Sequence, residues 1–229
     1  MLETIRQFGE PVLDVGCGTG RILLDFLAQG IDVDGVDNSP EMLTLCRNKA
    51  DKLGLHPQLS EQHMETLSLP RLYRIIFVPS SSFQLLTKKT EAEIAIRTFY
   101  AHLLPGGVLV MPFSFEWKLG TPLQMEWEKV FEKVRPEDGL TIRRWAKESF
   151  SPKKQLWHTE DRYEVLQNDE IILTEHHRRS PAGLWYTQVE QAVALYEKAG
   201  FTDIRVLGGF TLHPALPEET LFCVQGTKP

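Results

Sequence analysis

Two acidic residues and a glycine-rich turn near the start of the chain have the spacing of a nucleoside-binding site. Residues 12–21 read VLDVGCGTGR, an apolar run that ends in Asp14 and continues with glycines at alternate positions. Such glycines let the backbone turn tightly and bring bare N–H groups close to a ligand. A second run of alternating apolar residues ends at Asp37. An acid at a strand tip can accept hydrogen bonds from both hydroxyls of a ribose, so the pair predicts a nucleoside-cofactor site.

The spacing of the glycines bears on which cofactor binds. A dinucleotide fingerprint needs a third glycine where Arg21 stands. An acid beside the turn, Asp14, would repel a pyrophosphate but attract an amine. With Asp37 and the following segment NSPEML (residues 38–43), the pattern resembles the class I S-adenosylmethionine-dependent methyltransferases. A generic strand-to-helix turn is the plain alternative.

The resemblance implies roles for residues along S-adenosylmethionine. Asp14 and the turn would serve the methionine end, Asp37 the ribose, and Met42 the adenine ring, with a core methionine as the alternative. The family usually has an acid where His63 stands. A neutral His63 would accept the same bond through one ring nitrogen, and an exposed loop histidine is the alternative. The predicted cofactor-binding residues are Asp14, Gly16, Cys17, Gly18, Asp37, Asn38, Met42, His63, Met64 and Pro79.

A serine-rich segment, VPSSSFQ at residues 78–84, follows the expected fourth strand. It lacks the Asp/Asn-Pro-Pro-aromatic motif of nucleic-acid amino methyltransferases and the acid of aminopropyltransferases. It resembles the small-molecule branch, where this segment lines the acceptor pocket. A helix cap by serine is the alternative for this segment. Trp185 and Tyr186 open a later helix and could border the acceptor, with core packing as their alternative. The predicted substrate-pocket residues are Ser80, Ser82, Phe83, Trp185 and Tyr186.

Methyl transfer leaves little for a catalytic side chain to do. The donor is already activated, so the protein mainly positions the reactants and excludes water. A general base is needed only for a hydroxyl or a protonated amine. His176 and His177 are the candidate bases, one of them at most. They are adjacent on a predicted strand and face opposite sides, so together they cannot chelate a metal ion, and no metal site is predicted.

Composition limits the partners. The chain has 229 residues and a formal net charge of −6, which argues against a nucleic-acid surface. Three scattered cysteines form no disulfide framework or zinc motif. The first residues, MLETIR, have no apolar signal core, and no apolar run approaches membrane-spanning length, so we expect a cytoplasmic protein with no membrane partner.

Alternating strand and helix patterns predict an α/β fold. The sheet is doubly wound and mostly parallel, and in the resembled family a C-terminal antiparallel hairpin completes seven strands. Residues 1–113 form the expected cofactor-binding core, 114–183 an insert, and 184–229 a helix and the hairpin. The insert is predicted to begin with a helix over residues 124–134. An antiparallel β-meander follows, with strands at 141–150, 155–166 and 171–179. We expect it to act as a lid over the substrate pocket, or as a homodimer surface.

These observations predict transfer of a methyl group from S-adenosylmethionine to an oxygen or nitrogen of a small molecule. A nucleic-acid or protein methyltransferase is one alternative. The other is a non-catalytic S-adenosylmethionine-binding module, which the histidine at position 63 and the short segment before Val12 keep open. Asp37 is expected to be a surface group whose replacement leaves the fold intact.

Overall fold

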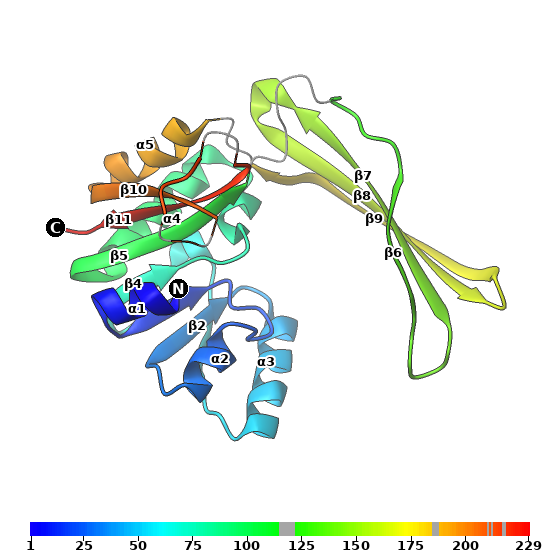
Figure 1. Cartoon of the computed structure of the whole chain (residues 1–229), viewed down its shortest axis with the longest axis horizontal. Coiled ribbons are helices and arrows are strands. Elements are labelled where there is room, and N and C mark those ends of the chain that lie inside the picture. The colour runs from blue at the N-terminus through cyan, green and yellow to red at the C-terminus, as the bar shows by residue number, and fades with distance from the viewer. Residues whose placement is uncertain (115–121, 185–187, 210, 212, 217–218) are drawn as a thin grey trace. The chain divides into compact units, whose positions relative to one another are not determined.

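The computed structural model describes residues 1–114, 122–184, 188–209, 211, 213–216 and 219–229. The chain divides into two compact units, Met1–Phe115 with Gln188–Pro229 and Glu116–Thr187. We call the first the α/β unit and the second the insert unit, and Figure 1 shows the elements of each. None of the described helices is long and apolar enough to cross a bilayer.

A seven-stranded sheet forms the centre of the α/β unit, in the order β10-β11-β5-β4-β1-β2-β3. Strands β1 to β5 pair in parallel, and β11 runs antiparallel to both β5 and β10. The predicted fold class is therefore confirmed. The strands are β1 (Val12–Val15), β2 (Val33–Asp37), β3 (Gln58–Glu61), β4 (Tyr73–Phe77), β5 (Leu103–Ser114), β10 (Thr202–Gly208) and β11 (Leu221–Thr227).

Helices cover both faces of this sheet. α1 (Leu2–Phe8), α2 (Leu23–Ala28) and α3 (Pro40–Leu53) pack on one face, where side chains of the helices join Val12, Ile75 and Val110 in one buried cluster. α4 (Lys89–His102) and α5 (Val189–Ala199) pack together beside β5, β10 and β11. The sequence determines the ends of α3 locally, because the Ser39 hydroxyl accepts a hydrogen bond from the Met42 N–H and Gly54 adopts the left-handed conformation.

The insert unit is a four-stranded antiparallel sheet in the order β6-β7-β8-β9, which we call the insert sheet. Its strands are β6 (Glu128–Val134), β7 (Thr141–Ser151), β8 (Leu156–Gln167) and β9 (Glu170–Leu184). The last three match the predicted meander. The predicted helix over residues 124–134 is wrong, since residues 128–134 form β6 and pair with β7. Apolar residues at Trp127, Val130, Phe131 and Val134 have helical spacing, but backbone pairing with the next strand prevails over that pattern.

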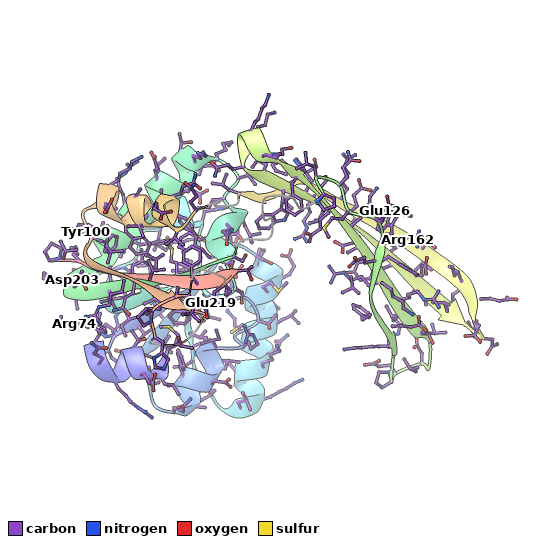
Figure 2. All side chains as sticks on the ribbon, turned by 45° about the horizontal axis from the view of Figure 1, so that its top comes forward. Arg74, Tyr100, Glu126, Arg162, Asp203 and Glu219 are labelled. Atoms are coloured by element: carbon purple, nitrogen blue, oxygen red, sulfur yellow. The ribbon has the colours of Figure 1, made fainter. Side chains whose placement is uncertain are left out.

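Ion pairs link the side chains of neighbouring strands in the insert sheet. Asp161 on β8 lies 2.7 Å from the Arg144 guanidinium on β7. On the other face, Glu164 accepts a hydrogen bond of 2.9 Å from the Trp145 indole and pairs with Arg162 at 3.0 Å. The Arg162 side chain, labelled in Figure 2, also lies over the rings of Trp127 and Trp145. Both faces of the insert sheet are therefore lined by charged and aromatic groups.

Candidate functional site

The turn after β1 is fixed to the neighbouring strand by its own backbone. The N–H groups of Gly16 and Cys17 both donate to the Val36 carbonyl on β2, at 2.7 and 3.0 Å. Gly20 has a φ of +80°, and an added Cβ would lie 2.5 Å from the Cys46 Sγ. A glycine is therefore required at the end of the turn, both for its conformation and for the close approach of α3.

Asp37, at the tip of β2, organises this turn. One carboxylate oxygen accepts a hydrogen bond of 2.8 Å from the Gly18 N–H, and the other accepts one of 2.9 Å from the Ser39 N–H. A carboxylate has about four acceptor positions, so each oxygen can still accept a bond from a ligand hydroxyl. The expectation that Asp37 is a surface group is wrong, because the residue is half-buried and bonded to the turn.

A pocket of about 370 Å³ opens beside Asp37 at the carboxyl ends of β1 and β2. That volume lies in the range of small-molecule sites. Seven of the predicted cofactor residues line the pocket, namely Gly16, Gly18, Asp37, Asn38, Met42, His63 and Met64. The sequence reasoning had not assigned a cofactor role to Val15, Val36, Ser39, Gln62, Glu65, Leu85 and Leu86, or to Ser82, which it placed in the substrate pocket.

One end of the pocket has the groups that a purine needs. Met42 is 44% exposed and lines the pocket, so it is not a core methionine. A His63 ring nitrogen lies 3.4 Å from the Asn38 amide nitrogen and 3.9 Å from the Glu65 carboxylate. Glu65 therefore brings an acid to the loop where the resembled family usually has one, two residues after the expected position.

Asp14 is a buried carboxyl without a partner. It is 1% exposed, and neither carboxyl oxygen has a hydrogen-bond partner among the described residues. Burial, with a smaller contribution from the Asp37 carboxylate and against the opposing effect of Arg21, raises its pKa to about 8. It directly precedes Val15 and Gly16 of the pocket wall and is not itself a wall residue. The Asp37 carboxylate in the pocket wall favours a cationic ligand over a pyrophosphate, and the positively charged S-adenosylmethionine fits this requirement.

The other predicted cofactor residues lie outside this pocket. Cys17 is buried, and burial raises the pKa of its thiol well above the usual range, so it stays neutral. Pro79 lines a second cavity on the α/β unit instead.

The segment after β4 only partly matches its predicted role. Ser82 lines the cofactor pocket, and its hydroxyl donates to the Pro79 carbonyl at 2.8 Å. The Ser80 hydroxyl accepts a hydrogen bond from Arg21, which connects this segment to the glycine turn. Phe83 is 1% exposed and packs against Phe99 and Phe113, so its assignment to a substrate pocket is wrong and core packing is correct.

The remaining predicted residues do not form a common site. His176 and His177 lie opposite Arg162 and Asp161 of β8, on successive positions and therefore on opposite faces of the insert sheet. His176 contacts the Trp127 ring and His177 the Tyr163 ring. Trp185 and Tyr186 lie outside the described residues. A base role for either histidine and a rim role for either aromatic stay predictions.

Comparison with known proteins agrees with this geometry. Residues 12–107 match a family described as a methyltransferase domain. A putative methyltransferase of Geobacillus sp. (strain WCH70) is 27% identical over 50% of this chain and 46% of its own length. The dTDP-3-amino-3,4,6-trideoxy-alpha-D-glucopyranose N,N-dimethyltransferase of Streptomyces venezuelae is 32% identical over 58% of this chain and 52% of its own length. The chain thus spans about half the length of these relatives.

A solved structure extends the likeness to the fold of the whole chain. An S-adenosylmethionine-dependent methyltransferase from Clostridium acetobutylicum superposes with a TM-score of 0.78, covering 99% of this chain and 88% of that one at 19% identity. The matched family segment contains the glycine turn, Asp14, Asp37 and the wall of the cofactor pocket up to Leu86. Residues 12–107 therefore match a methyltransferase domain, and the chain has the fold of an S-adenosylmethionine-dependent methyltransferase.

Proposed function

We propose that the chain transfers a methyl group from S-adenosylmethionine to a nitrogen or oxygen of a small molecule in the cytoplasm. The carboxylate of Asp37 carries this proposal, because it is held by two backbone N–H groups and still has acceptor positions facing a pocket of suitable size. The match of residues 12–107 to a methyltransferase domain supports the same donor. The net charge of −6 disfavours a nucleic-acid acceptor.

The residues of the site would bind and orient the two reactants rather than react themselves. When bound, S-adenosylmethionine would supply an activated methyl group: a lone pair of the acceptor would bond to the methyl carbon while the C–S bond breaks, and S-adenosylhomocysteine would leave with that electron pair. Asp37 would hold the ribose, and Met42 would pack on the adenine. Asp14, behind the turn, would offset the positive charge in its ionised form, which a nearby cation favours. Each of these contacts fixes the donor relative to the acceptor, which is the main source of rate in such a displacement.

One of the relatives favours an amine acceptor. The Streptomyces venezuelae relative is named for dimethylation of an amino sugar nucleotide. A neutral amine needs no general base, and among the described residues the possible bases in the pocket wall, His63, Glu65 and Asp37, are those assigned to the adenine and ribose of the donor. We therefore place a small amine first among acceptors, with a hydroxyl compound second.

A product screen tests this function. Small amines, alcohols and carboxylates are incubated with the protein and donor labelled in its methyl group, and products are identified by mass spectrometry. We expect a labelled N-methyl or O-methyl product. If S-adenosylhomocysteine binds but no compound is methylated, the non-catalytic binding module becomes the better account.

A further inference from the structure

A second cavity in the α/β unit contains a polar group that the fold leaves unused. The cavity is about 80 Å³ and lies on the face of β4, β5 and β11 that α1 also contacts. Val110 and Pro112 of β5 are paired with Gln225 and Cys223 of β11, so these four side chains form its floor. Ile22, Pro79 and Thr4 contribute to the walls. We call it the Gln225 cavity.

Gln225 is a polar residue among the apolar residues of this floor. The residue is 4% exposed, and its side-chain amide has no hydrogen-bond partner among the described residues. Thr4, also 4% exposed, contributes a hydroxyl that is likewise without a partner in the described part of the chain. Buried polar groups in folded proteins are nearly always bonded to protein or to ordered water, so the free amide beside this cavity is available to a molecule that enters it.

The position of the cavity connects it to the reaction. Pro79 follows β4 and Ile22 follows the glycine turn, so both walls belong to segments that also border the cofactor pocket. Cys223 cannot act there as a base or nucleophile at neutral pH, because burial raises the pKa of its thiol to about 12. The only charged side chain that lines the cavity, among the described residues, is that of Glu3, and Glu3 is exposed.

We propose that the Gln225 cavity is a subsite for the methyl acceptor and takes a compact aliphatic group with one neutral hydrogen-bonding atom, such as a hydroxyl. The amide of Gln225 can both donate to and accept from that atom, and the apolar floor covers the rest of the group. This inference rests on the proposed function, since it assumes an acceptor. The subsite would make the enzyme selective, because an acceptor without a hydrogen-bonding atom at this position leaves the Gln225 amide unpaired.

A pair of buried glutamines provides a matched test of stability. Gln84 is also fully buried, but its amide donates to the Ser114 carbonyl and accepts from the Ser114 N–H, at 3.1 and 2.8 Å. Gln225→Leu removes an unpaired polar group, so we expect Tm of the free protein to rise by about 2–4 °C. Gln84→Leu leaves backbone groups unpaired and should lower Tm by about 5 °C or more. A similar loss of stability in both variants would show that Gln225 is structural and would overturn the proposal.

Binding is tested with propan-2-ol as the probe. In ¹⁵N-labelled protein saturated with S-adenosylhomocysteine, we expect propan-2-ol to shift the side-chain amide signals of Gln225 and not those of Gln84. Gln225→Leu should bind S-adenosylhomocysteine as tightly as the wild type. It should also raise KM about tenfold for an acceptor found by the product screen. Unmoved Gln225 signals in protein that binds S-adenosylhomocysteine would refute the subsite alone, whereas failure to bind S-adenosylhomocysteine would refute the proposed function.

Discussion

Replacing Asp37 by alanine is expected to weaken S-adenosylhomocysteine binding by about 2–3 kcal/mol, which is roughly a 30- to 150-fold rise in Kd. The variant loses two charge-assisted hydrogen bonds to the ribose. It also frees the Gly18 and Ser39 N–H groups, which the carboxylate holds at 2.8 and 2.9 Å. Isothermal titration calorimetry measures the change directly.

Asp34 provides the control for this variant, because it lies on the same strand three positions earlier. Its carboxylate accepts from the Tyr73 hydroxyl at 2.8 Å and pairs with Arg71 at 3.3 Å, away from the cofactor pocket. Asp34→Ala should lower Tm and leave S-adenosylhomocysteine affinity unchanged. Equal affinities in the wild type and Asp37→Ala would mean that the ribose binds elsewhere.

Without ligand, the wild-type protein is expected to lose stability as the pH rises from 6 to 8, and Asp14→Asn is expected to lose much less. The folded protein holds a proton on Asp14 up to a pKa of about 8, whereas the unfolded chain releases it near 3.8. Raising the pH through this window therefore favours unfolding, by at most about 1.4 kcal/mol per pH unit. From pH 6 to pH 8 the wild type should lose about 5–10 °C in Tm through this group, and the asparagine variant should not.

Asp25→Asn is the matched control, since Asp25 is an exposed acid on α2. It should keep the pH profile of the wild type. Above pH 8, where the wild-type carboxyl is ionised, the Asp14 variant should also bind S-adenosylhomocysteine about tenfold more weakly, because it lacks the charge that offsets the ligand ammonium; at pH 6, where both side chains are neutral, the two affinities should be similar. A pH profile identical in the wild type and Asp14→Asn would contradict a buried, partnerless carboxyl at this position.

Local signals in the sequence sufficed for most of the α/β unit. Strand-to-helix turns at Gly16–Gly20 and caps at Ser39 and Gly54 define the order of elements, and the parallel sheet follows from that order. The first residues of the insert were misread because Trp127, Val130, Phe131 and Val134 satisfy a helical period while their strand pairs with β7. The spacing of apolar residues gives no information about which strand a segment pairs with, so the sequence alone could not distinguish strand from helix here.

The candidate site, too, was predictable only where local signals determine it. Asp37 and the glycine turn were predictable because strand ends of a parallel sheet meet at one edge. The hydrogen bond from the Gly18 N–H to Asp37 was not predictable, since it depends on how the turn after β1 folds back toward the tip of β2. Phe83 was placed in a pocket by its neighbours in sequence, but its ring packs with Phe99 and Phe113 from other elements. The place of Gln225 in a cavity could not be predicted either, because it depends on the pairing of β11 with β5.

A comparison of two ligands by calorimetry tests the central claim most directly. The same wild-type protein is titrated with S-adenosylhomocysteine and, separately, with NAD. The acid beside the glycine turn and the half-buried Asp37 predict saturable binding of S-adenosylhomocysteine and none of NAD. Binding of NAD without binding of S-adenosylhomocysteine would contradict the account.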